Sequence, residues 1–176
     1  TFSPQRYTLW YMQSSYHNLP DINGTAQQEG GRYRASDVRF TPQRRELSIE
    51  LSTAYPESAG IDSFRRTLRL DDNRVMVCDR FCLPKPGTVQ EHYLFQEEPD
   101  LSTPGLLRFA AGPSMAYDPS LSPICEPVCL LTTVDLADGQ DPRGNMARNW
   151  GKDILYRVTL AGSAGACTEY RLVIEA

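Results

Sequence analysis

Alternation of apolar and polar residues with a period of two is the feature that most constrains how this chain folds. It runs through residues 46–51, 64–70, 154–160 and 169–174. This period places successive side chains on opposite faces of a strand, one toward a core and one toward water. Thirteen prolines and twelve glycines are spread along the chain, and no window of eleven or more residues keeps a helical period free of them. The pattern predicts an all-β protein.

The turn residues divide the chain into short segments. We expect strands at residues 7–12, 33–40, 46–51, 64–70, 75–78, 89–96, 106–110, 128–134, 154–160 and 169–174. The run Asp71-Asp72-Asn73 between two of them is typical of a hairpin loop. About ten or more such strands predict an antiparallel β-sandwich with little helix. The longest expected loops cover residues 24–31, 97–105 and 137–151.

Composition narrows the class of protein. The 176 residues suit one domain, 1–176, and 40% hydrophobic with 23% charged residues indicates a globular chain. A net charge of −4 argues against a nucleic-acid partner, which needs a basic surface. No apolar run reaches the length of a membrane span, so we expect no membrane partner. The chain begins without methionine or signal peptide, and we expect either processing or a longer parent polypeptide.

The five cysteines do not suit a disulfide scaffold, because an odd number cannot pair fully. Four of them form two C-x3-C clusters, and the five are Cys78, Cys82, Cys125, Cys129 and Cys167. Positions i and i+4 of one strand lie roughly 13 Å apart, too far for a disulfide or a shared metal ion. Pairing between the two clusters across strands stays open. We expect buried free thiols that pack as small hydrophobes, which favours a reducing compartment.

The stretch 14–28, SSYHNLPDINGTAQQ, is the main candidate for a binding loop. It carries His17, one of two histidines, together with Asn18, Asn23 and Gln27. A polar, turn-rich loop between strands suits a binding surface. The alternative is an ordered loop whose amides satisfy its own backbone. Trp150, in the longest expected loop, is either a further ligand contact or an aromatic side chain that caps the core.

Sequence motifs for common enzyme chemistry are absent. No glycine-rich phosphate loop and no G-x-S-x-G nucleophile elbow is present. His17 with Asp37 or Asp21 could begin a zinc site, but zinc needs a third protein ligand and the sequence offers none. His92, inside a strand, is expected to have its ring nitrogens satisfied there.

Arginine is strongly preferred over lysine, which occurs only at Lys85 and Lys152. The planar guanidinium group suits carboxylate or sulfate, so this preference favours an acidic ligand. The alternative is that the arginines pair with acidic residues on exposed strand faces, such as Glu46, Glu50 and Asp62.

Residues 14–40 followed by 47–81 resemble the C-terminal β-sandwich of the heparinase II/III-like polysaccharide lyases. The shared features are a His-Asn pair, a turn with Gly-x-x-Gln, an Ala-x-Asp-Val strand, an Ala-Tyr-Pro segment, an Arg-Arg strand and a Val-x-Asp-Arg-Phe strand. The closing WGKDILYRVTL also resembles the end of such domains. The resemblance covers nearly the whole chain, and it is carried by the order and spacing of these motifs.

The resemblance implies a C-terminal domain that supports and partly lines a site for β-elimination on a uronate polysaccharide. An upstream α-helical toroid of the same protein would carry most of the machinery, so the isolated chain is expected to be inactive. His17 would be an auxiliary catalytic residue, and substrate contacts would come from Asn18, Asn23, Gln27 and Trp150. No cofactor is required, although some family members hold a structural zinc, for which His17 and Asp37 match two ligands. Family members are often exported, so the resemblance favours a periplasmic or secreted protein, whereas free thiols favour a reducing compartment.

Two other functions fit the residues. A freestanding carbohydrate-binding module would present exposed aromatics such as Tyr11, Tyr16 and Trp150 as a platform for sugars. A purely structural domain would hold a toroid or a dimer together. The glycan itself, whether heparan, alginate or another uronate polymer, is left open by the sequence.

Overall fold

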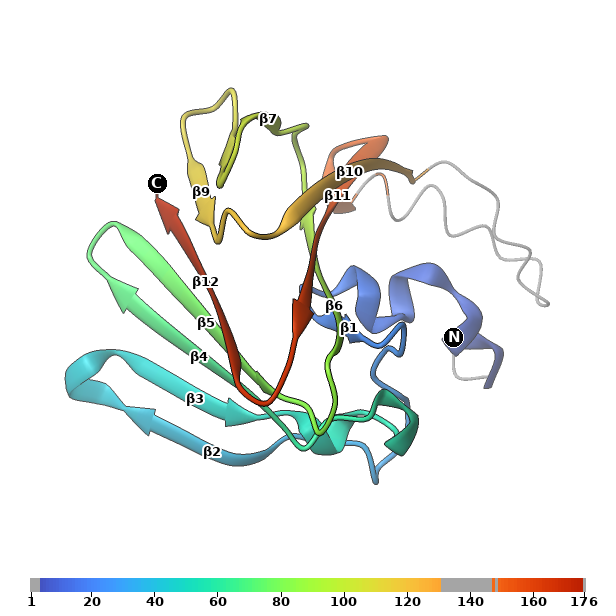
Figure 1. The fold of residues 1–176 in the computed structure, drawn as a ribbon. Helices are drawn as coiled ribbons and strands as arrows, with labels where there is room; N and C mark the ends of the chain where they lie inside the picture. The colour runs from blue at the N-terminus through green and yellow to red at the C-terminus, as the bar shows by residue number, and fades with distance from the viewer. Residues whose placement is uncertain (1–3, 131–146, 148, 176) are drawn as a thin grey trace.

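The computed structural model describes residues 4–130, 147 and 149–175, which form two antiparallel sheets packed face to face (Figure 1). The small sheet has the order β1 (Pro20–Ile22), β6 (Gly87–Phe95), β11 (Ile154–Ala164) and β10 (Ser122–Cys129). The large sheet has the order β2 (Ser36–Thr41), β3 (Glu46–Glu50), β4 (Ser63–Asp71), β5 (Arg74–Cys82), β12 (Thr168–Glu175), β9 (Ser114–Tyr117), β8 (Leu106–Arg108) and β7 (Asp100–Thr103). The expected all-β sandwich is confirmed.

The helical content of the described residues consists mainly of short 3-10 turns. Six are present: η1 (Pro4–Thr8), η2 (Trp10–Met12), η3 (Ser14–Tyr16), η4 (Pro42–Arg44), η5 (Ser52–Ala54) and η6 (Glu57–Ala59). The first two cover most of the segment expected as a strand at 7–12, and that expectation is wrong. Within the described part of the chain, no helix is long and apolar enough to cross a membrane.

The hydrophobic core lies between the two sheets. Phe64 of β4 and Phe81 of β5 are fully buried and stack with ring centroids 4.6 Å apart. Val89, Val158 and Leu160 of the small sheet belong to the same buried cluster. The alternation read from the sequence therefore directs one face of β4 and β5 inward, as a two-layer sandwich requires.

A charged cluster interrupts this core. Arg66 of β4 donates to Asp79 of β5 through Nε at 2.7 Å and through Nη2. Its Nη1 donates to the Asn18 carbonyl at 2.6 Å. Glu91 of β6 is fully buried and accepts a 3.0 Å hydrogen bond from the Tyr93 hydroxyl. Arg66 thus ties the large sheet to the chain just after His17, and this cluster fixes where the candidate loop begins.

Asn23 and Gly24 reverse the chain after β1. Both have positive φ, 51° and 69°, as a two-residue type I′ turn requires. Ile22 and Thr25 close the turn with backbone hydrogen bonds of 3.0 and 2.9 Å. A side chain at Gly87 could not fit there, because its Cβ would lie 2.2 Å from Asn23 Oδ1. The turn folds the segment beyond Thr25 back toward the N-terminal 3-10 turns.

Candidate functional site

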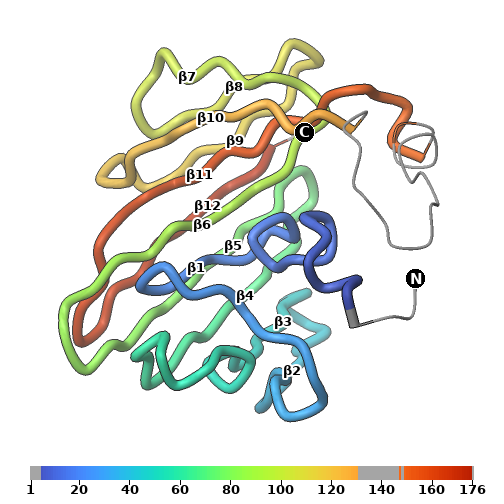
Figure 2. Tube along the Cα trace, turned by 90° about the vertical axis from the view of Figure 1, so that its right-hand side faces the viewer, coloured from blue at the N-terminus to red at the C-terminus, as the bar shows by residue number. Residues whose placement is uncertain are grey.

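The N-terminal 3-10 turns lie against β1 and β6 on the side away from the large sheet (Figures 1 and 2). Repeated i→i+3 backbone hydrogen bonds shape the segment, including Met12 N–H to Leu9 O at 2.9 Å and His17 N–H to Ser14 O at 2.9 Å. Leu9 is its buried anchor, with 4% of its surface exposed. The segment covers polar groups of the small sheet and brings His17 beside the loop that follows β1.

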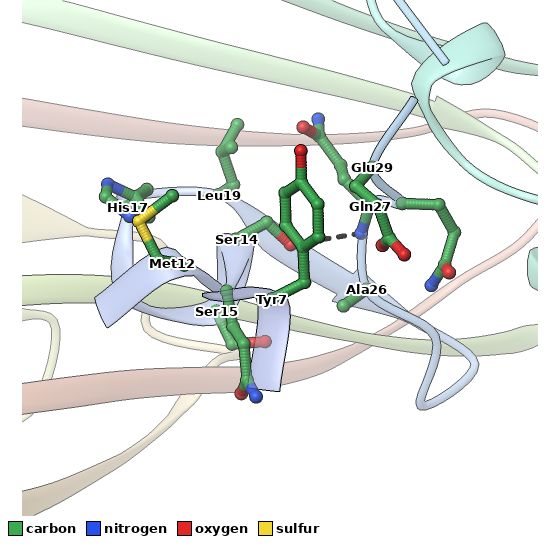
Figure 3. A pocket seen from close by; sticks show the side chains of 11 residues that line it. Tyr7, Met12, Ser14, Ser15, His17, Leu19, Ala26, Gln27 and Glu29 are labelled. Atoms are coloured by element: carbon green, nitrogen blue, oxygen red, sulfur yellow. Dashed lines mark hydrogen bonds between the residues drawn. The ribbon is translucent and has the colours of Figure 1, made fainter. Parts of the chain in front are cut away.

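A pocket of about 510 Å³ lies between this segment and that loop. We call it the His17 pocket, and it is lined by Tyr7, Met12, Gln13, Ser14, Ser15, His17, Leu19, Ala26, Gln27, Gln28 and Glu29. Figure 3 shows His17 and Met12 at one end, Gln27 and Glu29 at the other, and the Tyr7 ring between them. All its lining except Tyr7, Met12, Gln13 and Glu29 comes from the stretch 14–28 that the sequence nominates.

His17 is exposed, and its orientation is set by one backbone group. Its Nε2 lies 2.8 Å from the carbonyl oxygen of Tyr11. A carbonyl only accepts, so Nε2 must carry the proton and Nδ1 holds the lone pair in the neutral ring. The Nδ1 atom can then accept a hydrogen bond or a proton from a bound molecule.

Gln27 joins the two walls of the pocket. Its backbone N–H donates to the Ser14 hydroxyl at 3.0 Å, as Figure 3 shows. Its side-chain amide nitrogen is buried and interacts with the Tyr55 hydroxyl. That hydroxyl donates to the Pro20 carbonyl at 2.6 Å.

Ser15, Asp21 and His92 form a polar chain beneath the segment. Ser15 Oγ donates to Asp21 at 2.8 Å, and Asp21 Oδ2 lies 3.3 Å from His92 Nε2 without hydrogen-bond geometry. The other ring nitrogen lies 3.0 Å from the Thr159 hydroxyl. Burial would raise the pKa of Asp21, but His92 and Ser15 outweigh it and hold that pKa below its usual value. Ser15 contacts the carboxylate and not the imidazole, so these residues lack the order of a catalytic triad.

Asn18 and Asn23 serve the backbone around the pocket. Asn18 has a positive φ of 56° and its Oδ1 accepts from Leu94 N–H at 3.0 Å. Asn23 donates to the Ala59 carbonyl at 2.8 Å and accepts from Thr88 N–H at 3.0 Å. Neither lines the His17 pocket. Both asparagines therefore tie the loop to the backbone of distant segments and not to the loop's own backbone.

Trp150 and Asp37 lie apart from the lining of the pocket. Trp150 is 39% exposed, and the loop expected at 137–151 falls largely outside the described residues. Asp37 accepts from Arg39 at 2.8 Å and from Arg65 at 2.6 Å on the large sheet. These arginines hold the pKa of Asp37 below its usual value.

The described residues do not bring together a set of side chains that fits zinc. Asp37 is paired with Arg39 and Arg65, and the Tyr11 carbonyl engages Nε2 of His17, which leaves only Nδ1 as a metal ligand. Among residues 4–130, 147 and 149–175, no cluster of three His, Cys, Asp or Glu side chains could hold a metal ion. A structural zinc shared by His17 and Asp37 stays a prediction from the resemblance, and no step below involves it.

The 3-10 turns gather aromatic side chains, of which the sequence nominated Tyr11 and Tyr16 but not Tyr7 or Trp10. Trp10 packs edge-on against Tyr11 and Tyr16, with ring centroids 5.5 and 5.0 Å away. The Arg157 guanidinium lies 4.5 Å above the Tyr16 ring. Tyr7 lines the pocket itself. The aromatic density of YTLWYM was visible in the sequence, but its period did not reveal a 3-10 segment.

This fold is the one that the resemblance predicted. Comparison with solved structures finds a heparinase III gene product with a TM-score of 0.63 and 16% identity, over 94% of this chain and 24% of that one. Heparan sulfate lyase HepC from Pedobacter heparinus gives a TM-score of 0.61 and 10% identity, over 94% of this chain and 25% of that one. A mutant of that lyase gives 0.63 and 12%, over 99% and 27%.

This chain therefore spans about a quarter of the length of the lyases that share its fold. No family model and no curated protein matches its sequence. This chain and the two lyases share an architecture. Their sequence identity of 10–16% is too low for the role of a residue to be transferred by alignment.

Proposed function

We propose that this chain is the C-terminal β-sandwich of a heparinase II/III-like polysaccharide lyase, and that the His17 pocket forms part of its site for an acidic polysaccharide. The observation that carries the proposal is the fold match over 94% of this chain to about a quarter of two lyases. A domain of that relative size fits a larger protein in which an α-helical toroid supplies the rest of the cleft.

The pocket offers the groups that a sugar needs. The Tyr7 ring and Leu19 give an apolar surface for the face of a pyranose, and the Gln27 side chain adds a polar group to the same lining. Glu29 lies at the end opposite His17 (Figure 3). Its negative charge repels a uronate carboxylate, so the proposed orientation places that carboxylate at the His17 end.

In β-elimination a base removes the proton at C5 while the C4–O bond breaks and a C4=C5 double bond forms. Negative charge grows on the uronate carboxylate during this step, so groups that bind the carboxylate stabilise the transition state. His17 would take an auxiliary role, as a donor to the carboxylate when protonated or as a proton acceptor through Nδ1. Asn18 and Asn23 would position the loop without touching the sugar.

The principal base and acid would come from the upstream toroid, which would complete the cleft. The isolated chain is therefore expected to form no unsaturated product. Robust lyase activity of the purified 176-residue chain would contradict this division of labour.

A carbohydrate-binding module is the second candidate, and the aromatic group of Trp10, Tyr11 and Tyr16 favours it. Aromatic faces bind sugars through apolar contact and need no catalytic partner. Tryptophan fluorescence of the isolated chain, titrated with neutral and with uronate oligosaccharides, separates the two functions. Strong binding of neutral glycans that Trp10→Ala abolishes would favour the binding module.

The lyase proposal is tested by His17→Ala and Gln27→Ala in the full-length protein, with Gln43→Ala as the matched control. Gln43 is an exposed amide on the η4 turn and does not line the His17 pocket. Loss of a hydrogen bond to a charged substrate should lower kcat/KM for unsaturated product by about 10- to 100-fold in the first two variants. Melting temperatures should stay close to wild type. Unchanged turnover in His17→Ala would show that His17 takes no part in the reaction.

A further inference from the structure

Cys82 and Cys167 stand across from each other at one end of the large sheet. Cys82 ends β5, and Cys167 directly precedes β12. The antiparallel register pairs Thr168 of β12 with Phe81 of β5. One further step in that register sets Cys167 opposite Cys82.

The two chain segments stay together beyond the cysteine pair. Leu83 N–H donates to the Gly165 carbonyl at 2.9 Å. Both ribbon and tube views show the β5–β6 connection and the β11–β12 turn side by side (Figures 1 and 2). Opposed residues of an antiparallel pair have Cα atoms about 4.5–5.5 Å apart, within the range of about 4.4–6.8 Å that a disulfide spans.

The side chains point to the same, outer face of the large sheet. The alternation of β5 puts Cys82 on the face of Arg80, and Arg80 Nε contacts Cys167 Sγ at 2.9 Å. Burial and a hydrogen bond with Cys167 raise the pKa of the Cys82 thiol. Both thiols are free, Cys82 half-buried and Cys167 exposed. An oxidant in solution can therefore reach the Cys167 thiol, and the Cys82 thiol lies next to it.

The other cysteines lack this arrangement. Cys78 lies on the large sheet, whereas Cys125 and Cys129 lie on β10 of the small sheet. Pairing between the two C-x3-C clusters, which the sequence left open, would have to bridge different sheets. The expected burial of the thiols is also wrong, since none of the five is fully buried.

We propose that Cys82 and Cys167 form a disulfide when the protein meets a small-molecule disulfide oxidant such as glutathione disulfide. The Cys167 thiolate attacks one sulfur of the oxidant, forming a mixed disulfide and releasing one glutathione thiolate. The Cys82 thiolate then attacks Cys167 Sγ and displaces the second. The protons of the two cysteines pass to the two departing glutathiones, so one disulfide is reduced as one is made.

This bond would join β5 to β12, two neighbouring strands at the centre of the large sheet. It closes a loop of roughly 85 residues, for which the loss of unfolded-chain entropy is large. We expect the oxidised chain to melt about 5–15 °C higher than the reduced chain. The disulfide would stabilise the sandwich only under oxidising conditions, and this effect would not depend on a sugar bound at the His17 pocket.

The test is to incubate the purified protein in glutathione buffers of rising disulfide content, then to count free thiols and map linked peptides by mass. Wild type should lose two of its five thiols, and one linkage should join the peptides of Cys82 and Cys167. Cys125→Ser, the matched control, should lose two thiols as well. Cys82→Ser and Cys167→Ser should lose this linkage and the rise in melting temperature.

Three results would overturn the proposal. They are five thiols that persist in excess glutathione disulfide, a linkage through other cysteines, or a mixed glutathione adduct that never resolves. Each of these can be read from the wild-type protein alone, so the proposal does not depend on whether a serine variant folds.

Discussion

Replacing Glu91 with Gln is expected to remove most of the fall in stability that the sandwich undergoes as pH rises toward 8. Glu91 is fully buried between the sheets, close to Asp79 and Arg66. Burial, followed by the negative charge of Asp79, raises the pKa of Glu91 from 4.5 to about 8. The folded protein therefore keeps a proton that the unfolded chain releases above about pH 4.5.

The sign and size of the change in unfolding free energy follow from the linkage between protonation and folding. Between pH 4.5 and 8 the folded state binds more protons than the unfolded state, so stability falls as pH rises by up to about 1.4 kcal/mol per pH unit. Over the whole window the loss is at most about 5 kcal/mol, and rearrangement of the cluster on ionisation would reduce it to about 2–5 kcal/mol. In Glu91→Gln the amide stays neutral, can accept from Tyr93, and can donate toward Asp79.

The assay is urea unfolding of wild type and Glu91→Gln at pH values from 5 to 9. The variant should gain stability relative to wild type as pH rises, by about 2–5 kcal/mol at pH 8. Glu57→Gln, at an exposed position on η6, is the matched control and should follow wild type. Parallel curves for wild type and Glu91→Gln across the whole range would refute the reasoning.

Two further substitutions test the groups that hold the candidate site. Arg66→Ala leaves Asp79 buried without its partner and should cost about 3–5 kcal/mol in urea unfolding, whereas Arg65→Ala on the outer face should cost about 1 kcal/mol or less. Asn23→Ala loses two backbone-directed hydrogen bonds and places alanine at positive φ, so it should cost about 2–4 kcal/mol by thermal or urea unfolding.

The sequence predicted the long strands well because they are governed by burial. In β12, Tyr170 and Leu172 are buried between more exposed neighbours, as the period of two predicts. In β11 the strand was predicted but its alternation is incomplete, because Val158, Thr159 and Leu160 are all buried. The hairpin at Asp71–Asn73 joins β4 to β5 as expected. The strand β10 begins at Ser122, before the expected 128–134, of which residues 131–134 lie outside the described residues. Pro123 and Pro127 argue against a central strand, and both are tolerated because β10 is at the edge of its sheet.

Some residues of the His17 pocket were predictable from the sequence and others were not. His17 and Gln27 line the same pocket because Asn23-Gly24 reverses the chain, and Asn-Gly is the strongest short signal for that turn. Tyr7 reached the pocket through 3-10 turns that short-range periodicity cannot distinguish from a strand. Some of the arginines that the sequence associated with an acidic ligand form strand-face ion pairs instead, such as Arg65 with Asp37.

The cysteine pair was not predictable either. Cys82 and Cys167 are far apart in the sequence, and only the β5–β12 register brings them together. Strand order in a sandwich depends on which faces fit together, and a single sequence does not specify it. The charged cluster of Arg66, Asp79 and Glu91 was missed for the same reason, because its members come from three strands in two sheets.

The measurement that tests the central claim most directly is the mass of the native gene product, by immunoblot of source-cell extract with an antibody against this chain. We expect a band about four times the 19.8 kDa of this chain, because the chain spans 25% of a lyase with the same fold. Purified protein from that band should form unsaturated uronate product. A band near 19.8 kDa would contradict a domain that depends on an upstream toroid.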